Sequence, residues 1–355
     1  MKKTKAEGGR MNVAVNNHAS VINSKRWFVS HAELKDWLDR IAAARNLIAP
    51  RNVSGVVLYR RVGKSEEIAE TFTRPVLSIK EIFFPPTEQL FTIQKTGQEF
   101  HLEESFPGWE TVVFGVRPCD ARGVQLLDAV FLDTNPVDAF YARRRENTTL
   151  IGLACKEMGE TCFCTSTGGA PDSASGMDIM LYETEGGYLV EAVTEKGRFL
   201  ILGSEWREAT ASHSPIEAHR QFPVPERGVW PEHFNDAYWQ KMSERCLSCR
   251  ACAYVCPTCR CFAIRDEMVR PGEFERIRCW DACAGENYRR VAGGHKPRAE
   301  KGERLRNRFF CKFYYYPEQY GLGDALACTG CGRCIEVCPV GVDITEVLTD
   351  LEKIA

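Results

Sequence analysis

The chain has 355 residues, of which 44% are hydrophobic and 26% are charged. This length is enough for two ordinary domains with hydrophobic cores, and the composition excludes a disordered chain. A formal net charge of −2 argues against a dedicated nucleic-acid binder, which usually carries a strongly basic surface. No apolar run approaches the roughly 20 residues of a membrane span. Residues 1–24 lack the apolar stretch of a secretory signal, so we expect none there.

Cysteine is unusually abundant, with 17 residues. A chain of this size does not need disulfides to fold. We expect a cytoplasmic protein, and in that compartment this number of cysteines indicates metal binding. The thiols are unevenly spread, because one group lies between Cys119 and Cys164 and all the others lie between Cys246 and Cys338.

The first clear elements predict a strand–helix–strand unit. Residues 111–116 and 150–154 are expected to be buried strands, and residues 121–131 an intervening helix with Val124, Leu127 and Phe131 on one face. Asp120 is expected to cap this helix. Parallel strands joined by a helix are typical of an α/β domain.

Four cysteines follow these strands. Cys119 and Cys155 come just after the carboxyl ends of the two strands, and Cys162 and Cys164 lie on the next loop. Open α/β sheets bind their ligands at this edge. The four thiols could therefore hold a third [4Fe–4S] cluster, although their spacing matches no general signature. The alternative is that they are ordinary buried cysteines.

A proline-containing stretch around residues 212–235 has no clear periodicity and is predicted to be a linker. We therefore expect an α/β domain, with the possible extra iron–sulfur site, over residues 1–225. Residues 226–355 are expected to form a mainly α-helical, two-cluster ferredoxin-type domain.

The second domain contains the same cysteine motif twice. Each copy is C-x2-C-x2-C-x3-C followed by proline, the pattern of two-cluster ferredoxins, in which the fourth cysteine of each run ligates the other cluster. The pattern assigns Cys246, Cys249, Cys252 and Cys338 to a first [4Fe–4S] cluster. It assigns Cys328, Cys331, Cys334 and Cys256 to a second one. Zinc is the alternative, but zinc sites prefer separated C-x2-C pairs.

The long segment between the motifs is predicted to be helical, including residues 279–294 and 304–312. A final helix is expected after Asp343, with Ile344, Val347, Leu348 and Leu351 on one face. The basic stretch 286–312 is either a solvated helix face, a compensating charge for anionic clusters or a docking surface for an acidic partner.

Five cysteines remain without a role: Cys259, Cys261, Cys279, Cys283 and Cys311. We expect them to pack around the clusters, with a further cluster as the alternative. No nucleotide-binding motif is present, and no catalytic residue can be singled out.

Longer stretches around the cysteines resemble the β subunit family of sulfhydrogenases (cytoplasmic [NiFe] hydrogenases and sulfur reductases) and, more distantly, the A subunit of anaerobic sulfite reductases. The resemblance runs from about residue 80 to 340 and rests on Phe114-Gly-Val-Arg-Pro-Cys-Asp120, Cys162-Phe-Cys164, Cys256-Pro-Thr-Cys-Arg-Cys261, Trp280-Asp-Ala-Cys283, Ala292-Gly-Gly-His295 and Cys328-Thr-Gly-Cys-Gly-Arg-Cys334.

This resemblance implies a non-catalytic electron-transfer subunit of a multi-subunit oxidoreductase. It would relay electrons between a subunit that binds NAD(P)H and flavin and a terminal catalytic metal subunit, here a [NiFe] hydrogenase or sulfur reductase. The alternatives are the A subunit of an anaerobic sulfite reductase or a component of a heterodisulfide-reductase-linked complex. Two other classes remain open, a stand-alone flavin-dependent reductase and a structural or sensing iron–sulfur protein.

Overall fold

The computed structural model of the chain describes residues 25–106, 108–218 and 220–354. The segment 1–24, for which we expect no secretory signal, lies outside the described residues. Among the described residues, no helix is both long and apolar enough to cross a membrane.

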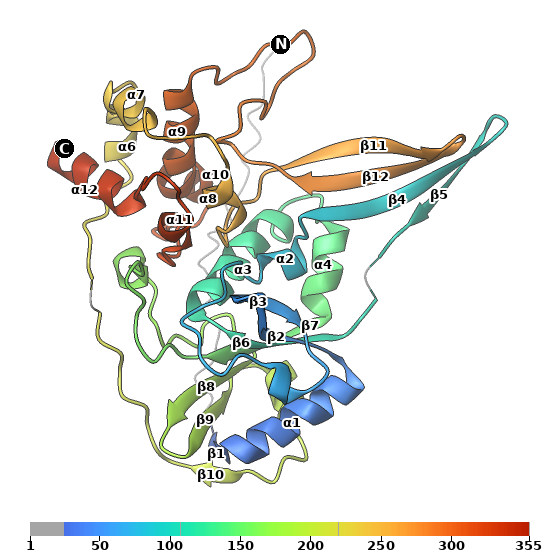
Figure 1. Cartoon of the computed structure of the whole chain (residues 1–355), viewed down its shortest axis with the longest axis vertical. Helices are drawn as coiled ribbons and strands as arrows, with labels where there is room; N and C mark the ends of the chain where they lie inside the picture. Colours follow the sequence, from blue (N-terminus) through green and yellow to red (C-terminus); the bar gives the residue numbers. More distant parts are fainter. Residues whose placement is uncertain (1–24, 107, 219, 355) are drawn as a thin grey trace, which may run out of the picture.

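The amino-terminal part is built on a mixed eight-stranded sheet in the order β10-β1-β9-β8-β7-β6-β2-β3 (Figure 1). Strands β2, β6, β7 and β8 run parallel to their neighbours in this series, and the outer pairs are antiparallel. The strands are β1 (Arg26–Ser30), β2 (Asn46–Val53), β3 (Val56–Arg61), β6 (Thr111–Val116), β7 (Thr148–Leu153), β8 (Ile179–Thr184), β9 (Gly187–Ala192) and β10 (Arg207–Ala209).

Helices cover both faces of this sheet. The alternation of side chains along β6 and β7 sends Val112 and Ile151 to the core beneath one face and Val113 and Leu150 to the core beneath the other. The helices on the first face are α1 (His31–Ala44) and α5 (Glu195–Ile201); those on the second are α2 (Lys80–Phe83), α3 (Pro118–Phe131) and α4 (Ala139–Glu146). The predicted α/β unit is confirmed, and β6 pairs directly with β7 in parallel.

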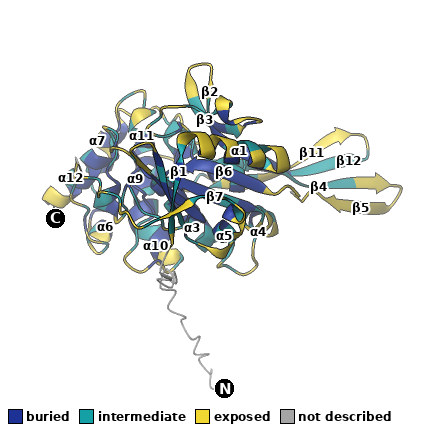
Figure 2. Cartoon of the chain, turned by 90° about the horizontal axis from the view of Figure 1, so that it is seen from below, coloured by how far each residue is buried: buried dark blue, intermediate teal, exposed yellow. Residues whose placement is uncertain are grey.

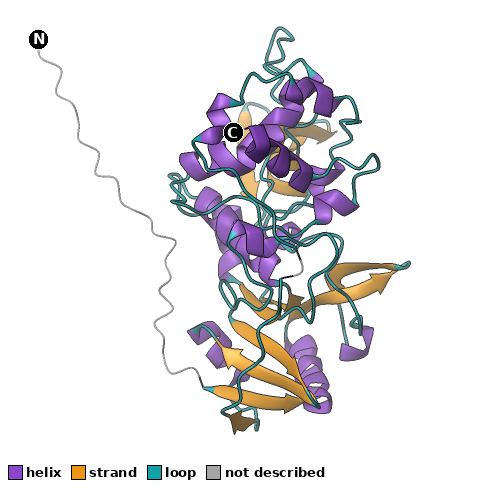
Figure 3. Cartoon of the chain, turned by 90° about the vertical axis from the view of Figure 1, so that its left-hand side faces the viewer, coloured by secondary structure: helices purple, strands orange, loops and turns teal. Residues whose placement is uncertain are grey.

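The carboxyl-terminal part contains short helices packed around an aromatic core that includes Trp230, Phe309 and Phe313 (Figure 3). The helices are α6 (Val229–Glu232), α7 (Tyr238–Ser243), α8 (Ala251–Tyr254), α9 (Lys301–Phe310), α10 (Tyr316–Gln319), α11 (Arg333–Glu336) and α12 (Ile344–Ile354), with a π-helical turn at Cys311–Tyr315. The predicted apolar face of the last helix is correct: Ile344, Val347, Leu348 and Leu351 are buried.

A second, four-stranded antiparallel sheet in the order β11-β12-β4-β5 extends from the body of the molecule (Figures 1 and 2). Its strands are β4 (Thr87–Thr96), β5 (Glu99–Glu104), β11 (Phe262–Arg270) and β12 (Glu273–Trp280). Because β4 pairs with β12, this sheet joins the two halves of the chain. Buried Arg278 on β12 also forms ion pairs with Glu88 on β4 and with Asp138.

This sheet corrects the prediction of a mainly helical segment between the two motifs. Residues 279–294 form the end of β12 and a series of turns instead of a helix. Two features of the backbone oppose a helix: β4 supplies a partner strand for β12, and Arg289 inside the segment has a φ of 60°. The predicted helix at residues 304–312 exists as α9 and the following π-helical turn.

Candidate metal centres

Four cysteines from opposite ends of the carboxyl-terminal part line one small cavity, together with Arg308. Cys246, Cys249 and Cys252 come from the turn before α8 and its first residues, and Cys338 follows α11. Backbone amides point at two of the sulfurs: Ser248 N donates to Cys246 Sγ at 3.3 Å and Val342 N to Cys338 Sγ at 3.1 Å. Such bonds stabilise a thiolate. We call this group the first site; it contains the four cysteines assigned to the first cluster.

The second site consists of Cys256, Cys328, Cys331 and Cys334. Burial raises the pKa of Cys328 to about 11. Burial also raises the pKa of Cys334, and the charged forms of the other three cysteines raise it further. The four thiols are therefore within electrostatic reach of one another. Cysteine thiols give up their protons when they bind a metal.

The two motifs fold into the same turn. In the first, Ser248 and Arg250 have φ values of 54° and 69°, and in the second, the corresponding Gly330 and Gly332 have φ values of 63° and 75°. A left-handed backbone at these two positions wraps the chain around one corner of the site. Glycine adopts it freely, whereas Ser248 and Arg250 do so at a cost of about 1–2 kcal/mol each.

Two buried cations lie among these thiols. Lys312 Nζ donates to Cys256 Sγ at 3.0 Å and to Thr258 Oγ1 at 3.0 Å. Burial alone would lower the pKa of Arg308, but Cys252 of the first site and Cys334 of the second raise it overall. Arg308 Nη2 is buried and has no hydrogen-bond partner among the described residues. A buried cation without an anion is costly, so the donors and charges here fit thiolate-bound, anionic iron–sulfur clusters.

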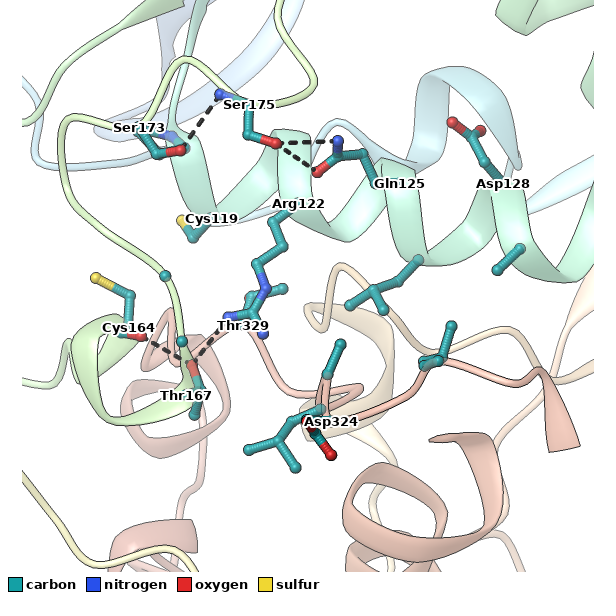
Figure 4. Close-up of a pocket in the computed structure, with 18 of the residues that line it drawn as sticks. Cys119, Arg122, Gln125, Asp128, Cys164, Thr167, Ser173, Ser175, Asp324 and Thr329 are labelled. Atoms are coloured by element: carbon teal, nitrogen blue, oxygen red, sulfur yellow. Dashed lines mark hydrogen bonds between the residues drawn. The ribbon is translucent and has the colours of Figure 1, made fainter. Parts of the chain in front are cut away.

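The four cysteines of the amino-terminal part also converge. Cys119 lies in the first turn of α3 after β6, and Cys155 follows β7, the neighbouring parallel strand. Burial, followed by the charges of Cys155 and Cys162, raises the pKa of Cys164 to about 12. We call this group the third site. Cys119 and Cys164 line one end of a cavity of about 820 Å³, into which Arg122 extends toward Thr167 (Figure 4).

Arg74 adds a cation to the third site. Its Nη1 donates to Cys162 Sγ at 3.2 Å and its Nη2 to Thr161 Oγ1 at 2.9 Å. Burial opposes the charge of this guanidinium, but the charged form of Cys162 raises its pKa overall. The third site therefore resembles the other two in combining thiols with a buried basic side chain.

The third site adjoins the second. Phe163 N donates to Gly330 O at 2.8 Å, and Cys162 Sγ lies 3.9 Å from the carbonyl oxygen of Cys331. The contact is so close that a Cβ atom on Gly330 would lie 2.5 Å from Cys164 Cα. In the second motif, glycine is thus required both by the turn and by the neighbouring loop.

Asp120 corrects a further prediction. The helix α3 begins at Pro118, with Arg117 as its N-cap, so Asp120 does not cap it. Its carboxylate instead accepts two hydrogen bonds from Arg333, at 2.6 and 2.8 Å, and both side chains are buried. Arg333 lies between two cysteines of the second motif and Asp120 follows Cys119. This ion pair therefore connects the second site to the third.

The remaining cysteines occupy three different places. Cys259 lies beside the second site, 3.6 Å from Lys312 Nζ. Cys279 is on β12, where Arg265 donates to its sulfur at 3.1 Å. Cys261, Cys283 and Cys311 line a separate cavity of about 1110 Å³.

The two ends of the basic stretch 286–312 differ in their burial. Its last members, Arg308 and Lys312, are buried against the cysteines and compensate charge. Arg289 and Arg290 are exposed at the rim of the 1110 Å³ cavity.

Several residues at the sites were not predicted, chiefly Arg74 and Lys80. Lys80 Nζ donates to the carbonyl oxygens of Tyr254 and Cys259, both at 3.3 Å, and burial lowers its pKa to about 8. Both side chains come from the amino-terminal part, in sequence surroundings without a motif. Among these residues, only Arg333 lies inside a recognisable motif, the second cysteine motif, so its place near a site could be expected from the sequence.

Within the described part of the chain, no three His, Cys, Asp or Glu side chains are arranged to hold a single metal ion. A cubane differs from a single ion because each of its thiolates binds a separate iron.

Comparison with known proteins shows the family of the chain. Residues 245–342 match the family described as a 4Fe-4S dicluster domain. The chain is 30% identical over 342 residues to sulfhydrogenase 2 subunit beta of Pyrococcus furiosus, an alignment that covers 92% of this chain and 99% of that protein. No solved structure gives a significant match. The chain therefore belongs to the sulfhydrogenase β subunit family.

Proposed function

We propose that this protein is an electron-transfer subunit of a multi-subunit oxidoreductase. The first site would hold one [4Fe–4S] cluster through Cys246, Cys249, Cys252 and Cys338. The second would hold another through Cys256, Cys328, Cys331 and Cys334. The main support is the buried guanidinium of Arg308, which lies between the two thiol groups and has one nitrogen without a partner among the described residues. When bound, such clusters supply one-electron transfer.

The third site, formed by Cys119, Cys155, Cys162 and Cys164, is proposed to hold a third [4Fe–4S] cluster. Its support is the convergence of the four thiols, the hydrogen bond from Arg74 to Cys162 and the direct contact with the loop of the second motif. The chain would then carry three clusters in a row, with the second site between the first and the third.

The residues around the sites have defined tasks in this proposal. Arg308, Lys312 and Arg74 would balance the negative charge of the thiolates, which favours the reduced, more negative state. Burial of the second site would keep water away from its sulfurs. Cys249 is exposed, so a partner could approach the first site closely.

The proposed partners follow from the relative, which is a subunit of a sulfhydrogenase. We propose a cytoplasmic complex in which one partner is a flavin subunit that uses NAD(P)H. The other would be the terminal metal subunit of a [NiFe] hydrogenase or sulfur reductase.

The test uses the assembled complex with Cys331→Ser. We expect the flavin to be reduced by NAD(P)H at the normal rate, while turnover at the terminal subunit falls at least tenfold. Cys279→Ser is the matched control, since this thiol lies on β12 away from the three sites, and it should behave as wild type. Normal turnover with the second cluster lost would contradict the proposal. Bound flavin in the isolated chain would favour a stand-alone reductase.

A further inference from the structure

Three of the cysteines without a role come together from distant parts of the sequence. Cys261 precedes β11, Cys283 lies in the turn after β12, and Cys311 begins the π-helical turn after α9. All three line the same cavity of about 1110 Å³. Cys283 is 7% exposed. π-Helical turns within α-helices are frequently found at functional sites.

The backbone holds two of these cysteines close together. Asp281 N donates to Cys261 O at 2.9 Å, which ties the start of the β11–β12 hairpin to its end. Cys283 follows Asp281 by two residues and lines the same cavity as Cys261. A metal ligand of this kind binds as the deprotonated thiolate.

The surroundings of the three thiols are positively charged. Arg260 Nη1 donates to Cys311 Sγ at 3.3 Å, and its guanidinium stacks 3.8 Å above the ring of Tyr316. Arg289, Arg290 and Arg298 also line the cavity. Thiolates that gather at a basic, partly buried site favour a soft, anionic metal centre.

We propose that Cys261, Cys283 and Cys311 ligate a further [4Fe–4S] cluster, whose fourth iron has no cysteine ligand and faces the arginine-lined cavity. The site lies near the second one, since Cys261 is on the same short loop as Cys256. Cys259 is not assigned to it, because its thiol contacts Cys256 and Lys312 of the second site.

The test measures iron, acid-labile sulfide and zinc per chain in anaerobically purified and reconstituted full-length protein. Cys261→Ser and Cys311→Ser should each contain about four irons fewer than wild type. The double variant should lose no more than either single variant, because both residues hold the same cluster. Cys279→Ser is the matched control and should keep the wild-type iron content.

The difference in iron content between each variant and wild type tests this site separately from the other three. Cys331→Ser should still lose its own iron whether or not the trio binds a cluster, so the proposed function and this inference can fail independently. Circular dichroism and the signals of the ferredoxin-type clusters show whether a variant is folded. Equal iron in Cys261→Ser, Cys311→Ser and wild type would overturn the inference. So would zinc at the trio, or a disulfide between Cys261 and Cys283 in the reconstituted protein.

Discussion

Around the first motif, Cys249 is exposed and Leu247 keeps 63% of its surface, whereas residues 327–333 of the second motif are all buried. Spacing and backbone conformation are the same in both turns, so the conformation of the turn does not cause the difference. The cause is the loop 161–164, which covers only the second motif. Local sequence therefore determines how each turn wraps its site, and long-range packing determines which site a partner can reach.

The largest predicted effect is on the buried ion pair of the second motif. Arg333→Met leaves the carboxylate of Asp120 buried without its cation, which should lower the free energy of unfolding by about 3–5 kcal/mol. Urea unfolding of the cluster-loaded protein measures this. Asp120→Asn in the same background should recover part of the loss, because it removes the unpaired charge.

The matched control is Arg250→Met in the first motif. Arg250 pairs only loosely with Asp281, at 3.7 Å and with 39% of its side chain exposed. Its loss should change the free energy of unfolding by less than ~1 kcal/mol. Equal losses in the two variants would mean that the two motifs do not differ in their environment.

A smaller effect is expected from adding one methyl group to the turn. Gly330→Ala would place a Cβ 2.5 Å from Cys164 Cα, so the loop of the third site must move. We expect a loss of about 2–4 kcal/mol from strain and overpacking together, and less iron at the third site. Thermal unfolding and iron content measure the two effects.

Ser248 already carries a side chain at the corresponding position of the first motif. Ser248→Ala should therefore change the free energy of unfolding by less than ~0.5 kcal/mol and leave the iron content unchanged. If Gly330→Ala proves equally neutral, the close contact between the second motif and the loop 161–164 is not as described.

The smallest predicted effect is a change in midpoint potential, which we expect for the second cluster and not for the first. Lys312 donates to Cys256 of the second site, so Lys312→Met removes a charge-assisted hydrogen bond from that site alone. The reduced state carries more negative charge and loses more stabilisation. The midpoint potential of the second cluster should therefore fall by roughly 60 mV, equivalent to ~1.4 kcal/mol for one electron. An EPR redox titration should find the first cluster unchanged; an equal shift of both would contradict the assignment.

Much of the fold near the cysteines could be predicted from the sequence. Buried apolar runs identified β6 and β7, and the apolar periodicity of residues 344–351 identified the last helix. The β11–β12 hairpin could not be predicted, because its partner β4 lies far away in the sequence. Isolated hairpins are only marginally stable in water, so the local pattern alone did not reveal these strands.

For the candidate sites, too, the sequence predicts what depends on local spacing and not what depends on distant partners. The spacing of the two motifs predicts how the eight ferredoxin-type cysteines divide between two sites. It gives no information about Arg74 or Lys80, which reach the sites only through tertiary packing. The local sequence favours Asp120 as a helix cap, but Arg333, a distant and buried partner, donates to both of its carboxylate oxygens.

The most direct test of the proposed electron path is the iron and acid-labile sulfide content of anaerobically purified protein, compared between wild type and Cys162→Ser. We predict that the variant loses about four irons while the signals of the two ferredoxin-type clusters persist. Unchanged iron in Cys162→Ser would contradict a third cluster and leave the buried second site without a neighbour in the amino-terminal part.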